Sequence, residues 1–177
     1  MSRFGYQVLG FGSGGKAPNA TITAKGVGGN TETDGTASGD YKYHVFNSNG
    51  TFTITAMDAG ATFDYVVVAG GGGGGGVGGY KPAAGGGGAG GRIYATAAAG
   101  AVTTFAVVIG AGGAGGSEED EGVEGSNTTF LQASGSGVQS TAVGGGGGAA
   151  PSASSSNEAT DGGSGGCLLY TSDAADE

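Results

Sequence analysis

The fold is decided by the stretch ATFDYVVVAGGGGGGGVGG, residues 61–79, in which an apolar strand passes directly into glycine. The continuous apolar run at 65–68 predicts a strand buried on both faces. The same kind of transition recurs, and glycine blocks lie at residues 70–79, 85–91, 110–116 and 144–148. A single glycine block is typical of a flexible linker, but four blocks, three of them entered from a valine-rich strand, indicate an ordered structure.

We expect these glycine blocks to pack against one another. Glycine has no Cβ atom, so extended glycine segments can approach as closely as collagen chains do at their common axis. The N–H and C=O groups of each segment can then bond to a neighbouring segment instead of to water. The expected result is a compact layer of left-handed polyproline-II-like or extended segments, with the strands packed beside it as a small sheet or sandwich.

Composition favours the same class of fold. The 177 residues include 46 glycines and no tryptophan. Glycine costs about 1 kcal/mol relative to alanine inside a helix, whereas β-branched and aromatic residues favour strands. Glycine and alanine bury little apolar area, so backbone hydrogen bonds, self-association or docking to a larger assembly must supplement the core. The sequence predicts a mainly β fold of short antiparallel strands with packed polyglycine segments and essentially no helix.

A β-hairpin is predicted near the start of the glycine-rich region. Residues 41–46 alternate in a strand period, and residues 51–56 alternate threonine with apolar side chains. Asn49 and Gly50 between them are a favoured pair for a tight turn. In this alternation His44 lies on the face opposite the tyrosines, which predicts an exposed position for it.

The chain divides into four regions by composition. Residues 1–40 are expected to form a glycine-rich arm with one or two short strands, and residues 41–150 a glycine-rich β domain. Residues 151–166 are expected to be a flexible Ser/Gly linker. The last region, 167–177, reads CLLYTSDAADE, and its codons resemble the transposase adapter used to prepare short-read DNA libraries. We expect this tail to be non-native, which indicates a metagenomic source and a natural C-terminus that is missing here.

No motif predicts catalysis or a cofactor. GFGSGGKA at residues 10–17 fits the first seven positions of a phosphate-binding loop, but Ala17 stands where a Ser or Thr must bind magnesium. The glycine runs match the dinucleotide-binding pattern only trivially, because no helix is expected after them. His44 is the only histidine and the single cysteine lies in the tail, so a zinc site cannot be assembled. We expect no enzymatic activity, no cofactor and no metal.

The charge balance argues against two classes of partner. The formal net charge is −9, and the six Lys and Arg residues are scattered singly. Nucleic-acid binding through phosphates needs a basic cluster, so it is not expected. No apolar run approaches the roughly 20 residues of a membrane-spanning helix, so membrane insertion is not expected either. With no signal peptide recognised, the chain is expected to be made in a cytosol.

Two loops are candidates for ligand contact. One is the charged cluster formed by Glu118, Glu119, Asp120, Glu121 and Glu124. It is typical of a solvated loop that keeps a protein soluble, and a weak calcium site or a receptor contact are the alternatives. The other is an aromatic and a cation between two glycine blocks, formed by Tyr80, Lys81 and Pro82. Binding residues concentrate on loops held by a scaffold, although this one would serve equally as a simple turn.

Three stretches taken in order resemble one family. They read YKYHVFNSNGTFTITAMDAGATFDYVVVAGGGGGGG, then GGGGAGGRIYATAAAGAVTTFAVVIGAGGAGG, then FLQASGSGVQSTAVGGGGGAA. Together they span residues 41–150 and are similar to the glycine-rich domain of bacteriophage tail and tail-fibre proteins. The resemblance implies a structural virion component, often at the host-contacting surface, in which polyglycine helices stack and loops face a receptor. Those loops would be the ones around 80–82 and 118–125.

The resemblance leads to a functional expectation with two rivals. The expected function is a non-enzymatic virion protein, tail or tail-fibre associated, that takes part in host attachment. Its expected partners are further copies of itself, with a trimer fitting a fibre, other virion proteins and a host cell-surface receptor. The rivals are a virion decoration or assembly protein without a receptor and a cellular glycine-rich surface or matrix protein.

Overall fold

The structure is a computed structural model that describes residues 8–12, 22–27, 34–38, 41–78, 83–98, 102–133, 137–150 and 159–163. Within these ranges the chain forms strands and no helix, as its composition predicts. The strands are β1 (Val8–Gly12), β2 (Ile22–Val27), β3 (Thr36–Ser38), β4 (Tyr41–Phe46), β5 (Gly50–Met57), β6 (Thr62–Val68), β7 (Arg92–Ala98), β8 (Thr103–Val108), β9 (Thr128–Gln132) and β10 (Gln139–Ala142). The chain divides into two compact units, one holding the strands and the other the glycine-rich segments.

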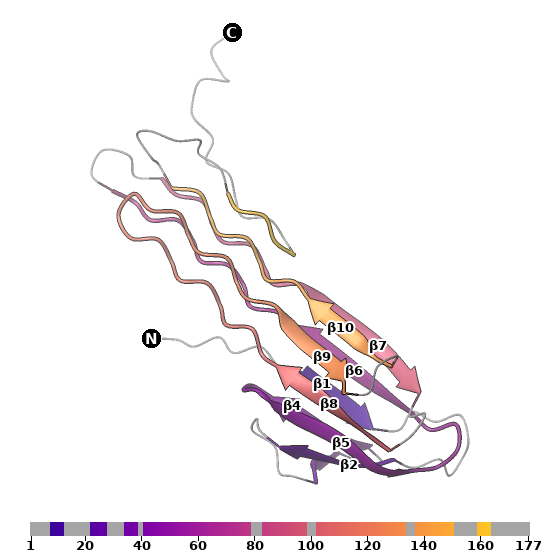
Figure 1. Ribbon diagram of the computed structural model, residues 1–177. Coiled ribbons are helices and arrows are strands. Elements are labelled where there is room, and N and C mark those ends of the chain that lie inside the picture. The colour runs from indigo at the N-terminus through magenta and orange to yellow at the C-terminus, as the bar shows by residue number, and fades with distance from the viewer. Residues whose placement is uncertain are drawn as a thin grey trace. The chain divides into compact units, whose positions relative to one another are not determined.

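The strands form a β-sandwich of two antiparallel sheets (Figure 1). The first sheet has the order β3-β4-β1-β6-β7, and the second has the order β10-β9-β8-β5-β2. β1 and β3, from the region expected to be an arm, belong to the first sheet, where β1 pairs with both β4 and β6. β2 pairs with β5 at the edge of the second sheet. The predicted fold class, a small antiparallel β structure with packed polyglycine, is confirmed.

A cluster of aromatic rings fills the space between the two sheets. Phe105 of β8 and Phe130 of β9 stack with their centroids 4.7 Å apart. Phe63 of β6, in the opposite sheet, meets Phe105 edge to face at 5.6 Å. The hydroxyl of Tyr65 lies 2.8 Å from that of Ser140 on β10, so this buried phenol keeps a hydrogen bond between the sheets. The run at 65–68 therefore does not bury both faces equally, since every second side chain enters the core while the others are half-buried.

The predicted hairpin around Asn49 and Gly50 is wrong, although both of its strands exist. β4 lies in the first sheet and β5 in the second, so the connection between them crosses the sandwich and does not join paired neighbours. The Asn49 side chain accepts a hydrogen bond from the backbone N–H of Ile109 at 2.9 Å, which ties the connection to the end of β8. Pairing with β1 and β8, far away in sequence, outweighs the local turn preference.

The predicted exposure of His44 is also wrong. The alternation in β4 is correct, but the core face carries His44 and Phe46, which are 3% and 1% exposed. Tyr43 and Val45 are half-buried on the other face. An alternating pattern defines two faces without saying which one is covered, and here the second sheet covers the face with Phe46.

The second unit, which we call the glycine module, consists of hydrogen-bonded extended segments (Figure 1). We number its described segments first to sixth: 69–78, 83–91, 111–117, 120–127, 143–150 and 159–163. Four of them contain the predicted glycine blocks. The fourth segment was predicted as part of a solvated acidic loop, yet it is bonded into the module on both sides, to the third and fifth segments.

Hydrogen bonds in the module recur every three residues. In the first segment, Ala69, Gly72 and Gly75 donate to the second segment at 3.0, 2.8 and 2.9 Å. The residues one position later, Gly70, Gly73 and Gly76, donate to the fourth segment at 3.0, 2.9 and 2.9 Å. A repeat of three residues is that of polyproline II, and no described glycine in these segments has a positive φ, which agrees with the negative φ of that helix.

The absence of Cβ atoms is what permits this packing. A Cβ built on Gly70, Gly73 or Gly122 would lie closer than 3.0 Å to a backbone carbonyl of a neighbouring segment, a distance that real Cβ atoms essentially never show. Ala111 and Ala114 of the third segment are three residues apart and both exposed, so one side of that helix accepts a methyl group. Ala149 and Ala150 of the fifth segment are instead fully buried.

Two pairs of neighbouring segments in the glycine module run antiparallel. Ala69 and Gly75 of the first segment donate to Gly91 and Gly85 of the second, and Ser126 and Val123 of the fourth donate to Ala111 and Ala114 of the third. Within each pair the bonds recur every third residue, whereas those of a β-ladder recur every second.

Replacing Gly73 by alanine should destabilise the protein far more than replacing Gly86. The new methyl at Gly73 would meet the carbonyl of Ala114, whereas no atom lies within 4 Å of a Cβ at Gly86. Overpacking of this kind costs about 1–3 kcal/mol. Gly86→Ala should instead raise the free energy of unfolding by about 0.4–1 kcal/mol, because alanine restricts the unfolded chain. Thermal unfolding followed by circular dichroism measures both changes, and equal effects would contradict close packing of the segments.

Candidate functional site

The candidate site is the turn that joins the third and fourth glycine segments. The antiparallel bonds between these segments, from Val123 to Ala114 and from Ser126 to Ala111, bring the chain to a reversal at residues 117–120. Three consecutive carboxylates lie in this reversal, at Glu118, Glu119 and Asp120, and all three are exposed. The glycine module therefore presents a compact negative charge at the tip of a hairpin.

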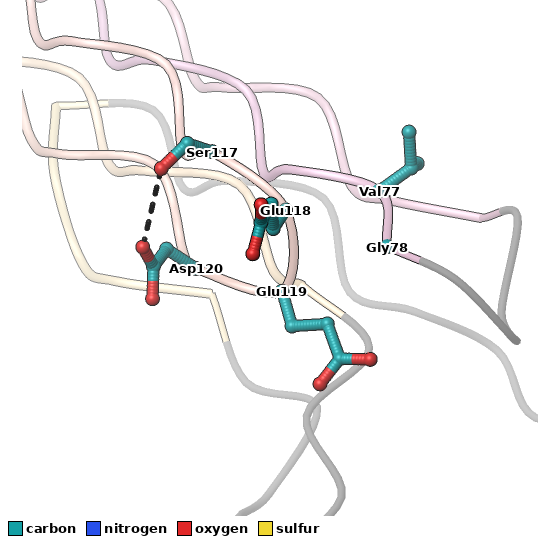
Figure 2. A pocket seen from close by; sticks show the side chains of 6 residues that line it. All are labelled: Val77, Gly78, Ser117, Glu118, Glu119 and Asp120. Carbon is teal, nitrogen blue, oxygen red and sulfur yellow. Dashed lines mark hydrogen bonds between the residues drawn. The ribbon is translucent and has the colours of Figure 1, made fainter.

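Two hydrogen bonds close the turn. The backbone N–H of Asp120 donates to the carbonyl of Ser117 at 3.0 Å. The hydroxyl of Ser117 donates to a carboxylate oxygen of Asp120 at 3.3 Å, as the dashed line in Figure 2 shows. The carboxylate of Glu119 points away from this pair in the same view. Asp120 thus shapes the turn, while the glutamates remain open to a ligand.

Glu118 adopts an unusual backbone conformation, with a φ of 52°. It is the one non-glycine residue with positive φ among those that the structure describes. This left-handed region costs an L-residue about 1–2 kcal/mol. Positive φ in a non-glycine residue is uncommon and occurs mostly in turns, as it does here.

A shallow hollow of about 360 Å³ lies beside the turn. Its lining residues are Val77, Gly78, Ser117, Glu118, Glu119 and Asp120. The end of the first segment forms the opposite wall, and the bond from Gly76 to the carbonyl of Asp120 holds it at 2.9 Å. Glu119 packs closely on Gly78, where an added Cβ would come within 2.6 Å of its Cγ.

The chemistry of this hollow suits a ligand that carries donors. Carboxylates accept strong hydrogen bonds from ammonium, guanidinium and hydroxyl groups. Val77, 57% exposed, adds a small apolar surface to the wall. In the part of the chain that the structure describes, no three His, Cys, Asp or Glu side chains are placed so that they could hold a metal ion.

The structure brings together only part of the predicted acidic cluster. Glu121 and Glu124 do not line the hollow, although both are exposed on the fourth segment beyond the turn. The second predicted loop, formed by Tyr80, Lys81 and Pro82, lies outside the described residues. The candidate site thus reduces to the turn and the wall opposite it.

Sequence reasoning missed three residues of this site. Ser117 could have been found, because a serine three residues before an aspartate is typical of a side-chain-bonded turn. Val77 carried a weaker signal as a lone interruption of the first glycine block. Gly78 carried none, since it is one glycine among many.

The fold and this site define a mainly β protein with a polyglycine-helix module that displays an acidic turn. A family described as glycine-rich domain matches residues 47–175, so the chain belongs to that glycine-rich domain family. Comparison with the curated proteins and with the solved structures gave no match. No helix in the described ranges is long and apolar enough to cross a membrane.

Replacing Glu118 by glycine should stabilise the turn, and the same change at Glu119 should not. Glycine adopts positive φ without steric cost, so Glu118→Gly removes a strain of about 1 kcal/mol and should raise the melting temperature. Glu119 has no positive φ and its side chain packs on Gly78, so Glu119→Gly adds freedom to the unfolded chain, removes that contact and should lower stability by about 1 kcal/mol. Differential scanning calorimetry compares the two variants. A lower melting temperature for Glu118→Gly would contradict the assigned strain.

Proposed function

We propose that this protein is a non-enzymatic structural component of a bacteriophage virion, associated with the tail or tail fibre and used in host attachment. The observation that carries the proposal is a hollow at the tip of a glycine hairpin that is lined by the exposed carboxylates of Glu118, Glu119 and Asp120. The resemblance of residues 41–150 to tail and tail-fibre glycine-rich domains supports the same function. The proposed function does not involve the adapter-like residues 167–177.

The glycine module supplies what an attachment site needs. Segments bonded along their backbones and the Ser117–Asp120 hydrogen bond hold the turn in place, which leaves the carboxylates of the glutamates for contact. Binding through a scaffolded loop lets the contacting residues change while the supporting structure stays constant. The proposed partners are a host cell-surface receptor at the turn, other virion proteins and further copies of the chain, with a trimer if the protein belongs to a fibre.

A paired substitution tests the attachment site. Glu118→Gln with Glu119→Gln removes two charges from the hollow and leaves the Ser117–Asp120 bond in place. Glu121→Gln with Glu124→Gln removes the same charge from the fourth segment and is the matched control. Flow cytometry of labelled full-length protein on candidate bacterial cells should show about a tenfold or greater loss of affinity for the first pair only, since hydrogen bonds to charged groups are worth about 1.5–3 kcal/mol.

The outcomes separate the proposal from its rivals. Equal losses of affinity from both pairs would show that binding depends on the net charge of the protein and not on the turn. Binding to no candidate cell, together with capsid genes as neighbours on the source contig, would favour a decoration or assembly protein. Cellular neighbours would favour a surface or matrix protein, and tail or baseplate neighbours the proposed function.

A further inference from the structure

His44 is a buried titratable group that the proposed function does not use. It belongs to β4 in the first sheet and is 3% exposed. Its ring meets Phe52 of β5, in the second sheet, edge to face at a centroid distance of 5.2 Å. The imidazole therefore lies at the interface between the two sheets of the β-sandwich.

Two glycines enclose the imidazole closely. A Cβ built on Gly26 of β2 would lie 2.8 Å from Nδ1. A Cβ built on Gly35 would lie 2.8 Å from Nε2 and 3.1 Å from the carbonyl of Tyr43. Gly35 also has a φ of 76°, which only glycine adopts readily, so its backbone turns over the ring just before β3. The edge formed by β2 and the start of β3 thus closes over the ring.

The Nδ1 atom of His44 has no hydrogen-bond partner although it is buried. A buried polar group without a partner costs about 1–3 kcal/mol. The cost is far greater for a charged group, because an imidazolium in this position would have lost its hydration and gained no acceptor at Nδ1. The closed arrangement therefore tolerates only the neutral ring.

The charges around the ring act in opposite directions. Burial and the nearby ammonium of Lys42 on β4 lower the pKa of His44 from its ordinary value of 6.5, and the carboxylate of Asp34 opposes them. β5 and β3 contain no ionisable residue, and on β2 the only one is Lys25, which is exposed. The neutral form is thus favoured at neutral pH.

We propose that protonation of His44 opens the edge of the β-sandwich formed by β2 and the Gly35–β3 segment. Water reaches Nδ1 only when this edge moves away from the ring. The carboxylate of Asp34, next to Gly35, favours the imidazolium while the edge is closed and so limits how far the pKa of the closed ring is lowered. Phe63, Phe105 and Phe130 contact Phe52 on its side away from the opening edge in this proposal, and their cluster stays closed.

The direction of the pH effect follows from proton binding. When the edge is open, His44 binds a proton with its ordinary pKa of 6.5. When the edge is closed, His44 binds a proton only at a lower pH. The closed edge is fully stable above pH 6.5 and loses stability as the pH falls from 6.5 to the pKa of the closed state. Across that window the opening equilibrium should rise about tenfold per pH unit.

Amide exchange of the full-length protein measures this opening. Hydrogen–deuterium exchange is followed between about pH 7.5 and 5, with rates corrected for the intrinsic pH dependence of the chemistry. Peptides that cover 22–46 should lose protection about tenfold per pH unit below 6.5, while the peptide that covers β9 keeps its protection. A flat profile over 22–46, or loss of protection in β9 over the same range, would overturn the proposal.

Surface charge variants test the assignment to His44 without disturbing the core. Lys42→Gln raises the pKa of the closed ring, so the loss of protection should level off at a higher pH, and Asp34→Asn should make it level off at a lower pH. Lys25→Gln is the control and should leave this lower end of the window unchanged. His44→Leu should abolish the pH dependence, and if that variant does not fold, the opposite shifts of the two charge variants still decide. Shifts in the same direction would contradict the proposal.

Discussion

The structure depends on backbone hydrogen bonds between segments that carry no Cβ at their contact positions. The first glycine segment is the centre of this arrangement, since it donates to the second and fourth segments and accepts from the third and fifth. Each such bond contributes only about 1 kcal/mol net, but a buried amide left without a partner costs about 1–3 kcal/mol. The segments therefore stabilise one another collectively, and an added methyl group at one contact position affects several neighbours at once.

Much of the fold could be predicted from local sequence, and the failures share one cause. Valine-rich runs that enter glycine blocks indicated both the strands and the packed polyglycine segments. The hairpin at Asn49 and Gly50 failed because β1, from the N-terminal region, pairs with β4 and leaves no place beside it for β5. The exposure of His44 failed because alternation does not say which face a second sheet will cover. Both errors concern long-range pairing, which no local pattern contains.

The candidate site was predicted only in part, for a different reason. The acidic run was taken as one loop, yet the structure divides it between a turn and a bonded segment. The signal was present in the three-residue spacing of Gly122 and Gly125, which are less exposed than the residues around them. The three-residue spacing of these two glycines was overlooked because most of the residues around them are acidic. Where polyproline-II helices are expected, a search for glycine at every third position is more informative than glycine content.

The three-residue repeat also has a bearing on how proteins of this kind can change in size. Inserting one residue into one glycine segment of a hairpin would rotate every following glycine of that segment away from its contact. A side chain would then face the carbonyl of a neighbouring segment. Inserting three residues in both limbs of a hairpin preserves every contact and lengthens it by one helical turn, about 9 Å at 3.1 Å per residue. Related chains should therefore differ in the length of these hairpins by whole turns, with the loop at the tip carried outward unchanged.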